Sequence, residues 1–139
     1  MTETDLKQLE KQLGFAVPDY YRATMLNYPF GADSFADDCM LPNRPDRVIE
    51  LVGVDSHFDG IEQPFFVGTD GGEEWYFVDS SKPDSGVFVF QLETGKHEPL
   101  SPSWNAYLDH IRAVDAEGAA DEAAELERKR NKKWWQFWI

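Results

Sequence analysis

The stretch that decides the fold lies between residues 64 and 92 and reads PFFVGTDGGEEWYFVDSSKPDSGVFVFQL. Three short runs of aromatic and β-branched residues are separated there by turn-forming residues, which is typical of adjacent antiparallel strands. The second and third runs are apolar at odd and even positions alike. Because the side chains of a strand alternate between two faces, we expect both faces of this sheet to be covered.

The residues before this stretch predict two helices. Apolar side chains of residues 4–13 follow one helical stripe, with Thr4 as the predicted N-cap and Gly14 as the predicted stop. Pro18 is placed to begin a second helix that runs to Leu26.

The remaining segments complete the predicted order of elements. Residues 29–45 are rich in Asp, Gly and Pro, so we expect an acidic loop, and residues 47–54 alternate in part and predict a strand. From residue 101 onward a core-facing helix is expected, with apolar side chains at helical spacing. These side chains are Trp104, Tyr107, Leu108 and Ile111. Helices followed by strands and a further helix indicate an α+β fold, a single antiparallel-rich sheet packed against N- and C-terminal helices.

Composition divides the chain of 139 residues into two parts. Residues 1–114 carry the strand and helix patterns and are numerous enough to bury a core, so they are predicted to form one domain. Residues 115–139 are rich in Ala and Glu at first and end in a basic-aromatic tail. With almost no apolar stripe to bury, this part is predicted to be a solvated arm.

The sequence predicts a cytoplasmic protein. No run approaches the roughly 18 apolar residues that a membrane span needs. Residues 1–5 are acidic and lack the apolar centre of a signal peptide. Cys39 is the only cysteine and therefore has no partner for an internal disulfide.

The charge of the chain favours a basic protein as the partner. The formal net charge is −13, and residues 1–114 hold 20 acidic and 8 basic side chains, a balance of −12. Such a surface repels nucleic-acid phosphate, whose binding requires Lys and Arg, and it attracts a basic protein. The alternative is an acidic surface that serves only solubility.

Acidic side chains in the predicted loops are the candidate partner-binding residues, because function concentrates on loops held by a rigid sheet. One group lies in the acidic loop and the other at the turn between the first two central strands. These residues are Asp33, Asp37, Asp38, Asp70, Glu73 and Glu74.

The sequence contains no pattern that predicts catalysis, a cofactor or a metal. Asp55, Ser56 and His57 are adjacent, and adjacent residues cannot form the geometry of a hydrolase triad. His97 and His110 stand alone, without the spacing of metal ligands. The Asp-Gly-Gly turn that begins at Asp70 lacks the alternating acidic residues of a calcium loop. We therefore expect a binding protein and not an enzyme.

The last residues form the most unusual feature of the sequence. Five basic side chains between Arg128 and Lys133 precede the candidate docking residues, which are Trp134, Trp135, Phe137 and Trp138. Three interpretations stay open: the tail folds back onto the sheet or pairs with a second copy in a homodimer, docks into another protein, or lies in a membrane interface.

Four motifs carry a family resemblance over roughly residues 5–112. They are Leu13-Gly14 before Val17-Pro18-Asp19-Tyr20-Tyr21, Phe66 to Gly72 followed by Tyr76 to Asp79, Gly86 to Phe90, and Ser101-Pro102-Ser103-Trp104. In order and spacing they resemble the SMI1/KNR4 family, also called the SUKH superfamily. The chain departs from the family at Asn27-Tyr28, where relatives usually have Asn-Gly.

The resemblance implies a sheet with helices packed on it and no catalytic centre. Bacterial members resemble immunity proteins that bind and neutralise toxins, often nucleases, and some eukaryotic relatives are regulatory or scaffold proteins. We therefore expect a non-catalytic bacterial immunity protein. The alternative is a regulatory or scaffold protein that docks to a partner or to the membrane surface through its tail.

Overall fold

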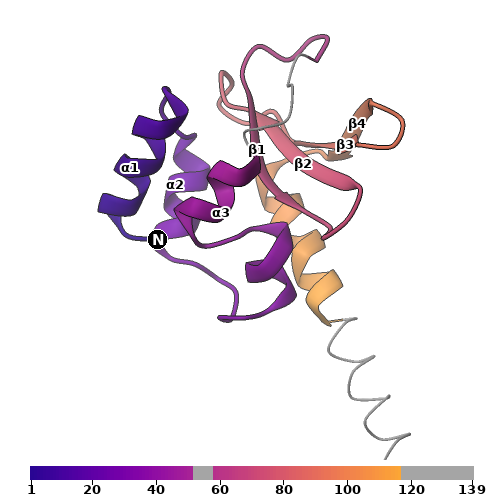
Figure 1. Cartoon of the computed structure of the whole chain (residues 1–139). Helices are drawn as coiled ribbons and strands as arrows, with labels where there is room; N and C mark the ends of the chain where they lie inside the picture. The colour runs from indigo at the N-terminus through magenta and orange to yellow at the C-terminus, as the bar shows by residue number, and fades with distance from the viewer. Residues whose placement is uncertain (52–57, 117–139) are drawn as a thin grey trace, which may run out of the picture.

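The computed structural model describes residues 1–51 and 58–116 (Figure 1). Within these ranges the order of elements agrees with the predicted α+β fold. The elements are α1 (Glu3–Leu13), α2 (Asp19–Leu26), a π-helix η1 (Ala36–Met40), α3 (Pro45–Glu50), β1 (Pro64–Thr69), β2 (Glu74–Asp79), β3 (Val87–Gln91) and β4 (Lys96–Ser101). A C-terminal helix follows, of which residues 104–116 are described.

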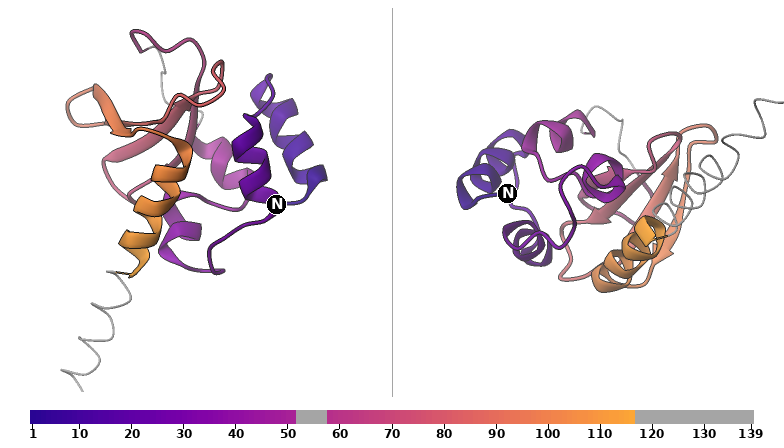
Figure 2. Two further views of the ribbon diagram at one scale, coloured as in Figure 1. Left: turned by 180° about the vertical axis from the view of Figure 1, so that it is seen from behind. Right: turned by 90° about the horizontal axis from the view of Figure 1, so that it is seen from below.

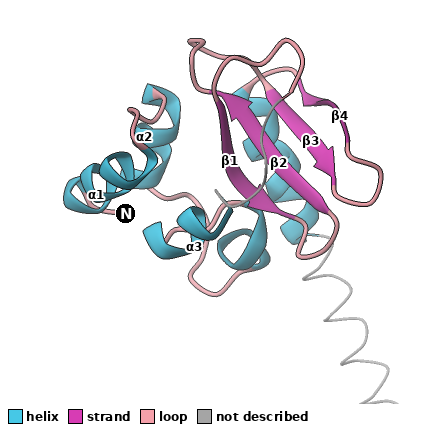
Figure 3. Ribbon diagram, turned by 45° about the horizontal axis from the view of Figure 1, so that its top comes forward, coloured by secondary structure: helices cyan, strands magenta, loops and turns pink. Residues whose placement is uncertain are grey.

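The described strands form one antiparallel sheet in the order β1-β2-β3-β4 (Figure 3). Each strand pairs with the next along the chain, so the sheet is a meander. The first three strands coincide with the predicted runs. The fourth, β4, was not predicted because it is a mostly exposed strand with Lys96, Glu98 and Pro99, and the sheet order makes it an edge strand, where proline is tolerated.

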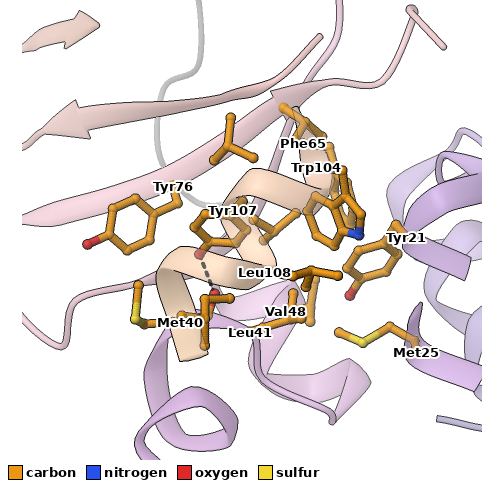
Figure 4. Packing of buried hydrophobic residues seen from close by; sticks show 14 of the residues in the cluster. Tyr21, Met25, Met40, Leu41, Val48, Phe65, Tyr76, Trp104, Tyr107 and Leu108 are labelled. Carbon is orange, nitrogen blue, oxygen red and sulfur yellow. Dashed lines mark hydrogen bonds between the residues drawn. The ribbon is translucent and has the colours of Figure 1, made fainter. Parts of the chain in front are cut away.

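One face of the sheet packs against the helices and forms the main core. Figures 2 and 3 show the C-terminal helix lying across this face. The ring of Tyr21 on α2 packs edge to face on Phe65 of β1, with the ring centroids 4.9 Å apart, and its centroid lies 6.0 Å from that of Trp104 on the C-terminal helix. The Trp104 indole N–H donates to the Thr24 hydroxyl at 2.9 Å. Aromatic side chains therefore join the N-terminal helices, the sheet and the C-terminal helix (Figure 4).

The opposite face of the sheet carries a second aromatic cluster. Phe58 stacks on Phe77 with the ring centroids 4.5 Å apart, and it also contacts Phe66 and Phe90. Phe66 and Phe77 are buried, whereas Phe88 and Phe90 are only partly buried. The two apolar faces predicted from the strand pattern are therefore both present, and the described residues cover the second one less completely.

Two sequence predictions between α2 and the sheet were wrong. The strand predicted over 47–54 is helical in its described part, since α3 covers Pro45–Glu50. Pro45 occupies the first turn of that helix, where its fixed φ favours helix and its missing N–H costs nothing. The acidic loop predicted over 29–45 contains the π-helix Ala36–Met40.

The ends of α1 show one correction and one confirmation. The N-cap is Thr2 and not Thr4, because the Thr2 side chain accepts from the Asp5 backbone while the Asp5 carboxylate accepts from the Thr2 backbone, which is a capping box. Gly14 ends the helix with φ of 84°, as predicted for a residue in the left-handed region.

Candidate functional site

A cavity of about 540 Å³ opens between η1, α3 and the turn that joins β1 to β2. We call it the hairpin pocket. Its lining combines carboxylates, one guanidinium, one indole and the backbone of the turn. The lining residues are Asp38, Cys39, Pro42, Arg47, Glu50, Leu51, Thr69, Gly71, Gly72 and Trp75.

Two glycines allow the hairpin to approach η1 so closely. A Cβ atom at Gly68 would overlap the carbonyl oxygen of Met40, so only glycine lets β1 pass the end of the π-helix. At Gly71 the backbone has φ of +86°, and a Cβ atom there would lie 3.3 Å from the Cys39 sulfur. The sequence prediction of a glycine turn is therefore confirmed at Gly71, and Gly68 serves close packing instead.

The π-helix wall of the pocket is anchored from both sides by hydrogen bonds. The buried Tyr107 hydroxyl donates to the Met40 carbonyl at 2.6 Å (Figure 4), and the Tyr28 hydroxyl donates to the Leu41 carbonyl at 2.6 Å. At the other end the Ala36 N–H donates to the Asp115 carboxylate at 3.1 Å. These bonds therefore fix both ends of η1.

The hairpin wall is held by its own polar side chains. The Asp70 carboxylate accepts from the backbone N–H groups of Gly72 and Glu74 at 2.8 and 3.1 Å, and the Thr69 hydroxyl accepts from Gly71 at 2.7 Å. These bonds shape the turn, and Asp70 itself remains exposed. The turn therefore presents a fixed negative charge beside the pocket.

The predicted acidic residues fall into two groups in the structure. Asp38 lines the hairpin pocket, and Asp70, Glu73 and Glu74 lie on the turn beside it. Asp33 precedes η1, and Asp37 is the second residue of η1. There Asp37 accepts from the backbone N–H groups of Asp33 at 3.2 Å and Asn43 at 3.1 Å, which is a loop-shaping role.

Asp38 and Asp70 both influence the pKa of the Cys39 thiol. Partial burial raises the pKa of the Cys39 thiol, the charges of Asp38 and Asp70 raise it further, and the charge of Arg47 opposes them. Asp38 and Cys39 of η1 line the same pocket as Gly71 and Gly72 of the turn, so the acidic loop and the hairpin turn converge there. The thiol stays protonated at neutral pH.

Sequence reasoning missed Arg47, Glu50 and Trp75 as pocket residues. Arg47 and Glu50 were assigned to a strand, on which they would not have been recognised as helix neighbours. Once Pro45 is recognised as a helix start, their spacing of three places both side chains on one helix face. Trp75 was assigned only to the sheet, and nothing in the sequence shows that it borders a cavity.

The other residues considered from the sequence are located as follows. The described residues do not include Asp55, Ser56 and His57, nor the tail residues Trp134, Trp135, Phe137 and Trp138. The scaffold or membrane role predicted from that tail therefore stays a prediction. The imidazole of His97 on β4 packs against the ring of Phe58 with the ring centroids 5.1 Å apart, and His110 is exposed on the C-terminal helix. In residues 1–51 and 58–116, no three His, Cys, Asp or Glu side chains come together as a metal ion would require. In the same ranges, every helix is too short or too polar to cross a bilayer.

The chain belongs to the SMI1/KNR4 family (SUKH-1), whose family model matches residues 1–110. Domains of this family typically bind protein partners, are generally non-catalytic, and are compatible with a toxin-immunity role. Comparisons with curated proteins and with solved structures give no significant match.

Proposed function

We propose that this protein is a cytoplasmic bacterial immunity protein that binds a basic toxin at the hairpin pocket and neutralises it without a reaction of its own. The observation that carries the proposal is the convergence of Asp38, Glu50 and the charged hairpin turn on one cavity with an indole in its wall. Family membership supplies the protein-binding role and its link to immunity.

The proposed mechanism is occlusion by charge and shape. A nuclease toxin must present basic groups to bind phosphate, and an acidic rim attracts the same groups. Trp75 is partly buried in the pocket wall, and tryptophan is among the side chains that contribute most to protein interfaces. The rigid anchoring of η1 through Tyr107 and Tyr28 means that little ordering is needed on binding.

The test is rescue of growth in a bacterium that is made to express a basic nuclease toxin, chosen by pull-down of toxin candidates with the full-length protein. We expect the wild-type protein to restore growth, and Asp38→Lys with Glu50→Lys to abolish the rescue. The matched control is Glu62→Lys with Glu98→Lys, which makes the same charge change at exposed positions away from the pocket. Equal rescue by both double variants would contradict the proposed binding site, and absence of rescue by the wild type would contradict the proposed function.

A further inference from the structure

The C-terminal helix leaves the described domain beside the hairpin pocket. Asp115, next to the last described residue of that helix, accepts a hydrogen bond from the backbone N–H of Ala36 at 3.1 Å. Ala36 is the first residue of η1, and Asp38 and Cys39 of the same short helix line the pocket. In Figures 1 and 2 the described end of the helix lies next to this segment. Everything that follows residue 116 therefore starts close to the pocket.

The segment that follows is opposite in charge to the carboxylates in and beside the pocket, which outnumber its one guanidinium, Arg47. Residues 128–139, which we call the basic-aromatic tail, hold five basic and no acidic side chains, with four aromatic residues among the last six. Left in water, such a cluster of tryptophans would be an exposed apolar patch that soluble proteins rarely keep. The tail therefore needs both an acidic and an aromatic surface.

The pocket and the neighbouring sheet face supply those two surfaces side by side. Asp38, Glu50 and the hairpin turn provide the carboxylates. Trp75 lines the pocket and also packs against Phe66 at 5.8 Å, edge to face, so it connects the pocket to the aromatic cluster of the second sheet face. Phe88 and Phe90 in that cluster are only partly buried. The basic residues of the tail match the acidic rim, and the tryptophans that follow them match the adjoining aromatic face of the sheet.

The intervening chain is long enough to reach. Residues 117–127 would span about 17 Å as an α-helix or about 36 Å fully extended. Both lengths are comparable with the size of a domain of this kind, whose radius of gyration is about 13 Å. Residues 128–139 themselves reach up to about 40 Å when extended, so they can return to the pocket across either distance.

We propose that the basic-aromatic tail docks on the hairpin pocket of its own chain, with its Lys and Arg side chains on the acidic rim and its tryptophans against Trp75 and the adjoining phenylalanines. Tethering makes this contact intramolecular, so weak individual contacts are sufficient to keep it occupied. A second consequence, which rests on the proposed function, is that a toxin has to displace the tail before it binds.

Cys39 provides a direct reporter of this docking, because it is the only cysteine of the chain and lines the pocket. The experiment measures alkylation of the full chain by iodoacetamide over a range of pH, which separates the limiting rate of the thiolate from the pKa of the thiol. The comparison is with Trp134→Ser, Trp135→Ser and Trp138→Ser together, a variant that keeps the charge and length of the tail. A tail docked about 90% of the time lowers the limiting rate about tenfold, so the variant is expected to react about tenfold faster.

A second pair of full-length variants tests the acidic rim. Asp38→Asn with Glu50→Gln should also raise the limiting rate of alkylation, which is independent of the change in thiol pKa that loss of the Asp38 charge causes, whereas Glu62→Gln with Glu98→Gln should leave the limiting rate unchanged. Circular dichroism and melting temperature verify that each variant is folded. The protection should be independent of protein concentration and should weaken at high salt.

Three results would overturn the proposal. Equal limiting rates with and without the tail tryptophans would show that the tail does not cover the pocket. Protection that grows with protein concentration would assign the tail to a second copy. Equal rates, together with sedimentation of the full chain on phosphatidylserine vesicles that the tail variant loses, would assign the tail to the membrane surface. Growth rescue by the tail variant is a separate readout, so failure of docking and failure of the immunity role are distinguishable.

Discussion

Tyr107→Phe and Tyr21→Phe make the same chemical change at two fully buried positions, and we expect opposite effects on stability. The Tyr107 hydroxyl donates a 2.6 Å hydrogen bond to the Met40 carbonyl at the end of η1. Among the described residues, the Tyr21 hydroxyl has no hydrogen-bond partner. The first substitution therefore removes a bond that fixes a pocket wall, and the second removes a buried polar group that binds nothing.

The magnitudes follow from the value of a buried hydrogen bond. Loss of the Tyr107 bond also leaves the Met40 carbonyl buried without that donor, so we expect a loss of about 2 kcal/mol in the free energy of unfolding. For a domain of this size that corresponds to a fall in melting temperature of about 8 °C. Tyr21→Phe keeps the same ring contacts with Phe65 and Trp104. Its stability should be unchanged or higher by up to about 1 kcal/mol.

Urea denaturation at pH 7, followed by circular dichroism, measures both differences. Hydrogen exchange should in addition show faster exchange of the η1 amides in Tyr107→Phe and not in Tyr21→Phe. If the two variants lose the same stability, the hydrogen bond to Met40 contributes nothing and the anchoring of η1 has been explained wrongly.

Three further outcomes are expected. Gly68→Ala should lower stability and accelerate alkylation of Cys39, because a Cβ atom there displaces the Met40 carbonyl; unchanged melting and reactivity would show that β1 does not need glycine. Burial would raise the pKa of Asp79, but hydrogen bonds from Ser81 and from the Glu62 and Gln63 backbones outweigh it and lower the pKa below 3.8. The stabilisation by this carboxylate is therefore present above about pH 4 and is lost as the pH falls through the lowered pKa. In urea denaturation, the stability difference between wild type and Asp79→Asn should be largest near pH 7 and shrink toward pH 2. A stability difference that does not depend on pH would contradict this explanation. Charge reversal at Asp38 and Glu50 should slow association with the toxin far more at low salt than at high salt, as measured by stopped flow, and salt-independent rates would exclude electrostatic steering.

The fold could be predicted wherever burial concentrates apolar side chains in a recognisable pattern. The strands β1 to β3 are apolar runs between turn residues, α1 has a helical stripe, and α2 is marked by Pro18 at its start. The edge strand β4 buries little, so its pattern resembles a loop. The β-branched pair Val48-Ile49 led to the prediction of a strand where the structure has α3. Pro45 in the first turn favours the helix.

The candidate site could be predicted only in part. Asp38 and Asp70 were proposed because acidic residues in loops are visible in the sequence, but the closeness of their two segments depends on the passage of Gly68 past Met40. That contact joins segments far apart in the chain, and no local pattern reports it.

Hydrogen exchange of the protein alone and in complex with a toxin that it neutralises in the growth-rescue test probes the central claim most directly. We predict that the toxin slows exchange in residues 36–42 and 69–75, the two walls of the hairpin pocket. Protection confined to α1 or to the β4 edge, with these segments unchanged, would contradict it.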